Sequence, residues 1–446
     1  MSVNKLNYIV DNDLCVRCGT CAGVCPVEAI TLDGNHYPVI NSSCIECGRC
    51  VKVCPGIDVN FPALTMQLFE KKFNIDELLG FFTHFYAGHA LDPDVRANAS
   101  SGGVITQLLI YLLEKKIIDG AIVTMIDPKA PCESKAVIVK TKNELLQSMQ
   151  SRYTIVPVNQ QLNKIKQMEG KFALVGLPCH IHGFWKLANI DPNIKDKIFL
   201  TLGLFCQTNI EHEGTLELQK ISRIPQKQIK NFEYRGGEWP GAIRVKLRNG
   251  TIHNLHYSSV KDGAYNYLSR LYYAKRCLYC IDGSSEMADI SFADPWIQDS
   301  NGDWMFKGGW TLVFQRTEKG GKILSEANKD KAIFIEELYE YSMLNRFIHN
   351  IGNKRKLAFV RLSRLKSRNK PVPEYHLGKP MVTRKDRRKE FMYSMTLLIS
   401  RHRLLKQIIM KILFSRSGIL LTKLRIAIKY NTHNINKNNK RFEKMI

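Results

Sequence analysis

The amino-acid sequence predicts a multidomain protein that combines the α+β and α/β fold classes, and three observations support this expectation. Two cysteine motifs of identical spacing occupy residues 15–55. Stretches typical of strands and helices alternate through the middle of the 446-residue chain, as in α/β domains. Residues 354–446 hold 26 Lys and Arg but only 4 Asp and Glu, which accounts for +22 of the net charge of +24. We therefore expect a small N-terminal unit, a nearly neutral central body and a basic C-terminal extension.

The two N-terminal motifs share the spacing C-x2-C-x2-C-x3-C-P and are offset by 29 residues throughout. In proteins with this spacing, three thiolates of each motif hold one [4Fe-4S] cluster, and the fourth reaches across to the other cluster. The first cluster is expected on Cys15, Cys18, Cys21 and Cys54, and the second on Cys44, Cys47, Cys50 and Cys25. Residues 1–62 are thus predicted to form a bacterial-type 2[4Fe-4S] ferredoxin domain that transfers electrons.

Zinc and disulfide bonds are the alternatives for these eight cysteines. A structural zinc ion leaves the third cysteine of each motif and the Cys-Pro ending without a role. Disulfides need an oxidising compartment, whereas no secretory signal precedes the motifs, so we expect the thirteen cysteines to lie in a reducing cytoplasm.

The next elements follow from hydrophobic spacing and turn residues. Residues 61–85 carry apolar side chains at helical intervals and link the ferredoxin unit to the body. A Ser/Gly-rich start at 100–103 opens a predicted helix over 104–116, which ends in lysines, as the helix dipole favours. Asp119-Gly120 then precedes a buried strand at 121–125.

Two later strands each lead directly to a cysteine. Residues 172–175 and 198–205 read as these strands, and residues 242–257 read as a hairpin around an Asn-Gly turn. Ligand sites in α/β sheets gather at the carboxyl ends of strands, so the cysteines there, with a C-x2-C pair further on, are candidates for one metal site. Buried cysteines that pack as small hydrophobic residues are the alternative. The four cysteines are Cys179, Cys206, Cys277 and Cys280.

Five motifs occur in order between about Tyr86 and Leu344. They are Ala-Ser-Ser-Gly-Gly-Val at 99–104, Val-Gly-Leu-Pro-Cys at 175–179, Gly-Leu-Phe-Cys at 203–206, Tyr-Arg-Gly-Gly-Glu-Trp-Pro-Gly at 234–241 and Ala-Asp-Ile-Ser-Phe-Ala-Asp-Pro-Trp at 288–296. This set resembles the motifs of the family of coenzyme F420 hydrogenase/dehydrogenase β subunits. Members of that family are flavoproteins with an additional [4Fe-4S] cluster, and some carry an N-terminal two-cluster ferredoxin.

The resemblance implies an α/β flavin and iron–sulfur domain behind the ferredoxin domain. Its N-terminal part would cover residues 85–160, after a linker at 63–84, and its C-terminal part, with a third [4Fe-4S] cluster, would cover residues 161–350. The four central cysteines match the positions that hold the family's own cluster. The extension would then cover residues 351–446.

The resemblance also implies which residues contact FAD. The Ser/Gly loop matches the family's flavin loop, where free N–H groups at a helix N-terminus suit a pyrophosphate; a simple helix cap is the alternative. The arginine at 152 stands where the family usually has Lys and would pair with a phosphate or with reduced flavin, unless it is a solvated surface charge. The expected flavin contacts are Ser100, Ser101, Gly102, Gly103, Arg152 and Asp294.

Three residues in this region have weaker signals. His180 departs from the glutamine that is usual in the family, and we expect it and His182 to be supporting or helix-face residues rather than ligands. Cys132 has no partner in the sequence and is expected to be inert. Asp294 itself has the alternative of ending a strand structurally.

The basic extension is predicted to be helical and amphipathic. Residues 396–413 place aliphatic side chains on one helical face and basic ones away from it, and residues 418–430 repeat this style. Such a helix suits an anionic membrane surface or an acidic partner, and a cap folded onto the body is the alternative. We expect no nucleic-acid partner, disorder at 431–440 and no membrane span. The expected location is the cytoplasm, with peripheral attachment at the inner membrane face if the helices bind lipid.

These expectations point to a flavin-dependent oxidoreductase that passes electrons between clusters, FAD and a hydride carrier such as coenzyme F420 or another small redox substrate. A ferredoxin or a partner redox subunit would be its one-electron partner. Two alternatives are a ferredoxin-dependent reductase acting on a cell-surface polysaccharide or lipid precursor, and a non-enzymatic electron-transfer subunit of a larger complex. The spacing identifies no catalytic residue.

Overall fold

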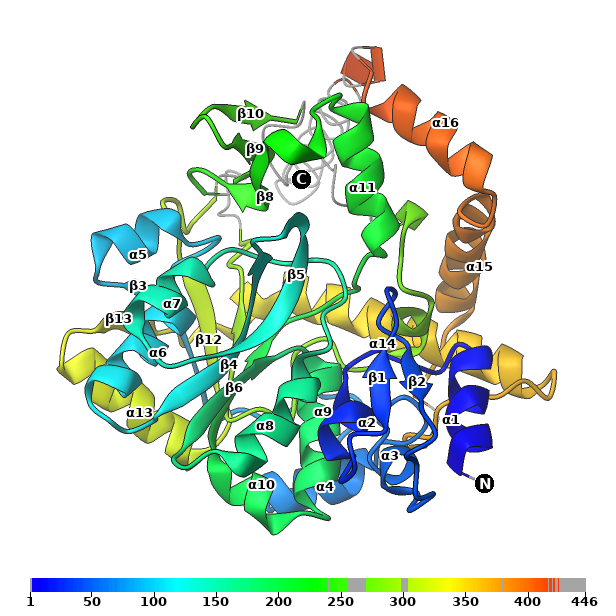
Figure 1. Ribbon diagram of the computed structural model, residues 1–446, viewed down its shortest axis with the longest axis horizontal. Helices are drawn as coiled ribbons and strands as arrows, with labels where there is room; N and C mark the ends of the chain where they lie inside the picture. The colour runs from blue at the N-terminus through cyan, green and yellow to red at the C-terminus, as the bar shows by residue number, and fades with distance from the viewer. Residues whose placement is uncertain are drawn as a thin grey trace, which may run out of the picture.

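The computed structural model describes residues 2–239, 241–255, 270–297, 304–378 and 380–415, together with residues 417, 418, 420, 421 and 424. These residues form a small N-terminal unit, an eight-stranded mixed sheet with helices on both faces, a three-stranded sheet and three C-terminal helices (Figure 1). The expectations for residues 425–430 and 431–440 lie outside the described residues.

The N-terminal unit contains two copies of one short structural motif. Gly19 and Gly48, 29 residues apart, each precede a short helix and have positive φ values of 81° and 73°, a conformation that favours glycine. The two strands of the unit pair antiparallel. The backbone thus carries the duplication that the cysteine spacing indicates. The elements are α1 (Ser2–Asp11), α2 (Thr20–Val24), β1 (Ile30–Leu32), β2 (Pro38–Ile40) and α3 (Arg49–Lys52).

The large sheet has the strand order β13-β3-β12-β11-β7-β6-β4-β5. Its centre is parallel, because β4, β6, β7 and β11 run in one direction, and the remaining strands are antiparallel to their neighbours. The strands are β3 (His84–Ala90), β4 (Gly120–Asp127), β5 (Ala130–Val139), β6 (Phe172–Gly176), β7 (Ile198–Leu204), β11 (Ile290–Ala293), β12 (Thr311–Gln315) and β13 (Ile333–Glu337). The predicted strands and the helix at 104–116 are present with shifts of at most two residues at their ends.

Helices cover both faces of this sheet, as the hydrophobic runs of its central strands require. On one face, α6, α7 and α13 pack on Ala121, Val123 and Leu202. On the other face, α8, α9 and α10 pack on Ile122 and Leu174. The helices are α5 (Pro93–Asn98), α6 (Val104–Glu114), α7 (Lys142–Gln147), α8 (Leu162–Gln167), α9 (Pro178–Ala188), α10 (Pro192–Lys197) and α13 (Glu318–Lys329).

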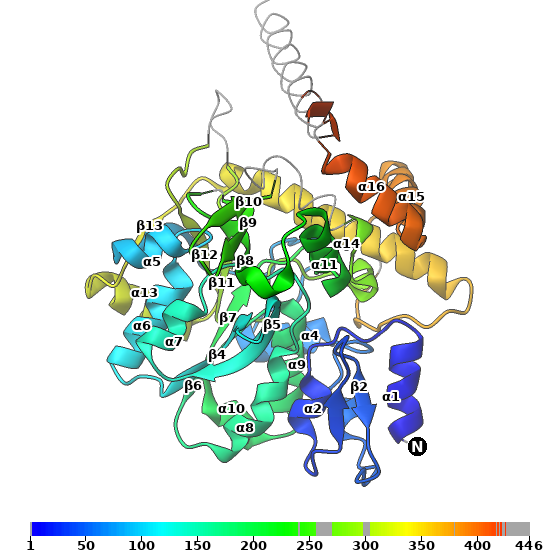
Figure 2. The ribbon, with the colours of Figure 1, turned by 45° about the horizontal axis from the view of Figure 1, so that its top comes forward.

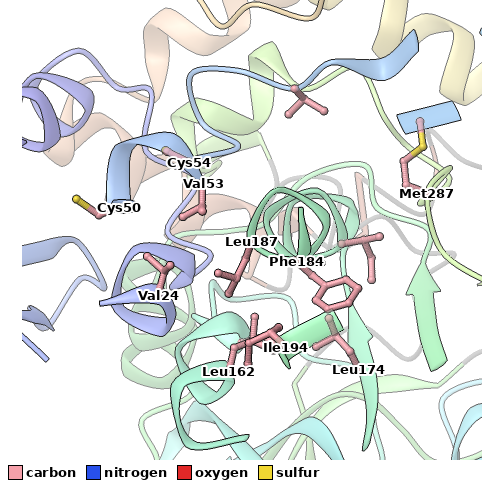
Figure 3. Close-up of a cluster of buried hydrophobic side chains, with 14 of the residues drawn as sticks. Val24, Cys50, Val53, Cys54, Leu162, Leu174, Phe184, Leu187, Ile194 and Met287 are labelled. Carbon is pink, nitrogen blue, oxygen red and sulfur yellow. The ribbon is translucent and has the colours of Figure 1, made fainter. Parts of the chain in front are cut away.

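The N-terminal unit shares a hydrophobic core with the second of these faces. Val24 and Val53 from the unit belong to one buried cluster with Leu162, Phe184 and Leu187 from α8 and α9 (Figure 3). The linker begins with α4 (Phe61–Phe69), and its first residue is fully buried in the same cluster. The unit is therefore docked firmly on the body.

A second, smaller sheet is built from the predicted hairpin and the strand before it. Strands β9 (Ala242–Leu247) and β10 (Ile252–Asn254) pair antiparallel around the Asn-Gly turn, and β8 (Ile229–Gly236) pairs with β9. Helix α11 (His212–Ile221) packs beside this sheet through Leu218.

The C-terminal helices are α14 (Asn345–Lys366), α15 (Arg384–Ile399) and α16 (Arg403–Leu413), and they lie along one side of the molecule (Figure 2). The expected domain boundary at residue 351 falls inside α14, whose Arg355 and Ala358 are fully buried in the body. The helical face expected over 396–413 is divided between α15 and α16. Among the described residues, no helix is both long and apolar enough to cross a bilayer. Short 3-10 turns complete the chain at Val158–Gln161, Gln226–Gln228, Lys275–Tyr279 and Tyr341–Leu344.

Candidate iron–sulfur and flavin site

The first expected quartet of cysteines comes together in the N-terminal unit. Burial raises the pKa of Cys15 to about 12 and that of Cys18 to about 11. After burial, the nearby thiol of Cys54 raises both pKa values most. Burial also raises the pKa of Cys21 well above its usual value, with further contributions from Cys18, Cys15 and Cys54. Thiols influence one another in this way only at short range, so these four cysteines are neighbours.

The second quartet also contains one cysteine from the other motif. Burial raises the pKa of Cys50 to about 11, and the thiols of Cys47, Cys25 and Cys44 raise it further. Cys25 therefore reaches across to the second motif as the spacing predicts. Cys47 is exposed, which places this quartet at the surface of the unit.

The four central cysteines line one cavity. Cys179 lies in the first turn of α9 after β6, Cys206 follows β7, and Cys277 and Cys280 belong to a short turn of 3-10 helix and its end. Burial raises the pKa of Cys206 to about 12, and Cys277 and Cys280 add to it, against the opposing effect of a nearby lysine. Cys15 lines the same cavity.

The arrangement of these cysteines fits cubane clusters. Among the described residues, no three or more His, Cys, Asp or Glu side chains are placed to hold a single metal ion. Each quartet instead supplies four thiols, the donor set that a [4Fe-4S] cluster takes. Buried thiols with mutually raised pKa values also need a bound cation before they can become thiolates together. The donor set therefore agrees with [4Fe-4S] clusters at all three quartets.

The first quartet and the central quartet are adjacent. After burial, the largest contribution that raises the pKa of Cys179 comes from Cys18 of the N-terminal unit. Helices α2 and α9 approach closely beside these two cysteines, because a Cβ at Gly183 would overlap Thr20 Oγ1 and lie 2.9 Å from Asn159 Nδ2. Asn159 Nδ2 completes the contact by donating to Thr20 Oγ1 at 2.9 Å.

Two cations, the half-buried Lys354 and the buried Arg276, lie beside the central quartet. Lys354 on α14 donates from Nζ to the carbonyl oxygens of Cys206 at 2.6 Å and Asp282 at 2.7 Å. Burial alone would lower the pKa of Lys354, but the nearby thiols and Asp282 raise it above its usual value. Arg276 donates to the carbonyl oxygens of Leu14 and Gly56, which ties both cysteine motifs to the turn that carries Cys277.

The two histidines of α9 have structural partners. His180 Nδ1 accepts from the Leu177 N–H at 3.1 Å, and Nε2 lies 3.0 Å from the Val156 carbonyl oxygen. Burial lowers the pKa of His180 to about 4, so the ring is neutral. His182 Nε2 lies 3.0 Å from Asp282 Oδ2, and both side chains are buried at the wall of the cavity. Both rings support α9 and the cavity wall, as expected from the sequence.

The expected flavin loop lies at the same edge of the sheet as the central quartet. Gly102 donates its N–H to Thr311 Oγ1 at 3.0 Å, and Thr311 begins β12. Strand β11 lies between β12 and β7, and Cys206 follows β7 by two residues. Because neighbouring strands are about 4.8 Å apart, the loop and Cys206 are separated by two strand spacings, about 10 Å along the edge.

The loop itself opens α6 without a side-chain cap. Gly103 has a φ of 75° and no capping side chain, so the first N–H groups of α6, from Val104 to Thr106, have no intrahelical acceptor. Gly102 is needed for packing, because a Cβ there would lie 2.6 Å from the Gly88 carbonyl oxygen. The free anion-binding groups are thus those of α6 rather than the Gly102 N–H.

The two serines of the loop make structural hydrogen bonds. Ser100 Oγ accepts from the Ser151 N–H at 2.8 Å, which joins the loop to the segment that carries Arg152. The Ser101 hydroxyl donates to the Trp310 carbonyl oxygen, just before β12. Both hydroxyls therefore hold the loop in place at the edge of the large sheet.

Arg152 is half-buried. Its terminal nitrogens donate to the carbonyl oxygens of Ser151 and Met149, and its buried Nε has no hydrogen-bond partner. Burial lowers the pKa of Arg152 to about 10. Among the described residues no carboxylate forms an ion pair with this guanidinium, although Glu233 is near enough to oppose the shift.

Asp294 follows β11 and pairs with the buried Arg235 of β8. The guanidinium of Arg235 also lies over the Trp296 ring, 5.4 Å from its centroid. Trp296 packs on Trp239 and Trp304 at centroid separations of 5.1 and 5.4 Å. The small sheet therefore contributes an aromatic and cationic wall beside the end of β11.

Sequence reasoning missed three cations of the candidate site, two beside the central quartet and one on the aromatic wall. Arg235 lies inside one of the five ordered motifs, so its position was a usable signal. Lys354 and Arg276 had no such signal, because Lys354 looks like one more charge of the basic extension and Arg276 is a basic residue beside a cysteine. Their roles depend on contacts with residues far away in the chain.

Comparison with known proteins agrees with this organisation. Residues 85–163 and 169–340 match the family models of the N-terminal and the C-terminal part, respectively, of the "Coenzyme F420 hydrogenase/dehydrogenase, beta subunit". Residues 7–55 match the model of a "4Fe-4S dicluster domain". Lys354 and the helices α14 to α16 lie beyond the last of these matches.

Three similar proteins indicate the range of the relatives. The coenzyme F420-dependent sulfite reductase of Methanocaldococcus jannaschii is 28% identical over 79% of this chain, which spans 52% of that protein. The F subunit of the F420H2 dehydrogenase of Methanosarcina mazei is 27% identical over 71% of this chain and 83% of its own length. A chain of the F420-reducing [NiFe] hydrogenase complex of Methanosarcina barkeri has the same fold, with a TM-score of 0.54 and 23% identity over 68% of this chain and 99% of its own.

Proposed function

Because the chain belongs to the family of coenzyme F420 hydrogenase/dehydrogenase β subunits and carries a 4Fe-4S dicluster domain, we propose that it is an iron–sulfur flavin oxidoreductase with three [4Fe-4S] clusters and FAD. It would move electrons between a hydride carrier, coenzyme F420 or a similar small molecule, and a one-electron partner. When bound, FAD exchanges both hydride and single electrons, whereas the clusters exchange single electrons only. The protein would hold the clusters and FAD at short separations and exclude water from them.

The observation that carries this proposal is the row of three cysteine quartets. The exposed Cys47 belongs to the outermost quartet, Cys54 and Cys18 belong to the next, and Cys18 is a neighbour of Cys179 in the central one. Buried contacts between the N-terminal unit and α9 fix this order. Such a row suits electron transfer from the surface of the protein to the edge of its large sheet.

The flavin would lie at that edge, between the start of α6 and the aromatic wall of the small sheet. The uncapped N–H groups of α6 suit the pyrophosphate, since a helix N-terminus attracts anions. Arg152 is a half-buried cation whose buried Nε has no hydrogen-bond partner, and it would suit a second negative group. The proximity of the loop to Cys206, about two strand spacings, favours direct electron exchange with the central cluster.

Two other functions are consistent with part of these observations. A subunit that only transfers electrons would need the quartets but not the flavin loop, and the relatives named above include subunits of larger assemblies. A ferredoxin-dependent reductase of a cell-surface polysaccharide or lipid precursor would need both. Bound flavin argues against the first alternative, and oxidation of reduced coenzyme F420 by the purified protein separates the main proposal from the second.

Anaerobic purification with iron, sulfide and flavin quantified tests the cofactor assignment. We expect about twelve irons per chain and one FAD, and about eight irons in Cys277→Ser/Cys280→Ser. The N-terminal clusters should keep their electron paramagnetic resonance spectrum in that variant. A wild-type protein with eight irons and bound zinc would contradict the third cluster.

The flavin loop has a separate test that keeps the fold intact. Thr106→Asp places a carboxylate in the first turn of α6, where it favours the helix but repels a pyrophosphate. We expect at least a tenfold loss of FAD affinity, whereas the neutral Thr106→Asn should retain FAD. Equal FAD content in both variants would show that α6 does not hold the phosphates.

A further inference from the structure

Helices α15 and α16 expose two apolar faces that the fold does not use. On α16, Leu404, Ile408 and Ile412 recur every four residues and are 75%, 53% and 56% exposed. The opposite face of α16 packs against the small sheet through Met410 and Phe414, which are buried. The exposed row is therefore surplus to the packing of this helix.

Helix α15 repeats the arrangement. One of its faces is exposed and apolar, because its large apolar side chains recur at intervals of three and four residues. The other side of α15 faces the body: Leu397 is buried, and the buried Glu390 pairs with Arg361 of α14. Both helices lie at the outer edge of the molecule (Figure 2). The exposed residues of α15 are Phe391, Met392, Met395, Leu398 and Ile399.

The unpaired charges of these two helices are basic, and Lys406 of α16 is paired with Glu213 of α11. Residues 380–415 hold nine Lys and Arg and two acidic residues. Asp386 caps α15 by accepting from Thr383, and Glu390 is the buried partner of Arg361, so neither carboxylate remains on the outer face. Residues 384 and 388, both arginines, are exposed and precede the apolar residues of α15 at helical spacing, so they continue the same face.

We propose that the exposed faces of α15 and α16 dock this protein on an anionic lipid surface. An aliphatic row with basic flanks and no outward carboxylate is the composition of a helix that lies in the interface of a bilayer. Each cation near such a surface adds attraction that salt screens. An acidic protein would match the same charges, and the experiments below separate it from lipid.

Sedimentation of the full-length holoprotein with vesicles tests the proposal. We expect binding to vesicles of phosphatidylglycerol and phosphatidylcholine, release at about 1 M salt, and little binding to phosphatidylcholine alone. Leu404→Ser/Ile408→Ser/Ile412→Ser should weaken binding at least tenfold, whereas Met66→Ser/Leu91→Ser/Ile252→Ser, at exposed positions elsewhere, should not. Failure of the wild type to bind, or equal binding by both triple variants, would overturn the proposal.

Two further variants separate charge from burial in lipid. Arg384→Gln/Arg388→Gln should reduce binding at low salt, and Lys71→Gln/Lys72→Gln on the linker should leave it unchanged. Ile408→Trp should gain fluorescence that brominated phosphatidylglycerol quenches, and this reading holds even if the serine variants lose iron and unfold. Unquenched fluorescence from this variant, or exclusion of vesicles by an acidic protein bound over Ile408, would assign the face to another partner.

Discussion

At the residue scale, Lys354 is the cation whose removal should be most informative. Its Nζ donates to two carbonyl oxygens at the wall of the central cavity, and the half-buried side chain lies near Cys206, Cys277 and Cys280. If the four central cysteines hold the proposed cluster, a positive charge there would stabilise its reduced form, because a charge away from water is weakly screened. Lys354→Met should therefore lower the reduction potential of the third cluster by roughly 50–100 mV, or about 1–2 kcal/mol for one electron.

The measurement is an anaerobic redox titration followed by electron paramagnetic resonance, with iron content as the control for an intact cluster. Lys354→Arg keeps the charge and should shift the potential much less. If both variants shift it equally with iron retained, the lysine acts through packing and not through its charge.

The sequence predicted which cysteines come together better than it predicted the residues around them. The cysteine spacing carries its own pairing rule, and the structure brings together Cys25 with the second motif and Cys54 with the first. The cations at the central quartet act through contacts that no local pattern encodes. For Gly102 the sequence predicted a contact with flavin, whereas the structure shows that the position lacks room for a side chain because Gly88 packs against it.

At the scale of elements, the contact of α2 with α9 determines how the N-terminal unit meets the body. Gly183→Ala should push the two helices apart, because its Cβ would overlap Thr20 Oγ1. We expect a loss of about 1–3 kcal/mol in the free energy of unfolding, as for other overpacked cores. Thr20→Ala removes the overlapped oxygen, so the double variant should be less destabilised than the sum of the two changes.

Denaturant unfolding of the four proteins, with cluster absorbance as the second signal, measures this coupling. A strictly additive cycle would mean that the helices adjust independently and that Cys18 is not held against Cys179 by this contact. The positions of strands and helices could be predicted from the spacing of apolar residues and from turn residues. The close approach of α2 and α9 could not, because that spacing does not tell which helices become neighbours.

At the scale of the whole molecule, the basic extension consists of two structurally different parts. Helix α14 belongs to the body, since Arg355 is buried with Glu286 as its ion-pair partner and Lys354 reaches the central cavity. Helices α15 and α16 carry the outward charge and the exposed apolar faces. The net charge of the sequence identified the basic extension as a separate region. It does not distinguish cations that are buried and paired from cations that face a partner.

The order of the quartets makes a prediction for the complete electron path. Cys47 is the exposed one of the thirteen cysteines, and the exposed Ile45, Val27 and Val39 lie in the same unit, so an external one-electron partner should meet the protein at the second cluster. With the hydride donor in excess, Cys47→Ser should slow reduction of an added ferredoxin at least tenfold and leave flavin reduction, followed by its absorbance, unchanged. Cys132→Ser, at the one cysteine outside the three quartets, is the matched control and should change neither rate. If Cys47→Ser leaves ferredoxin reduction intact, electrons leave the protein from a different quartet.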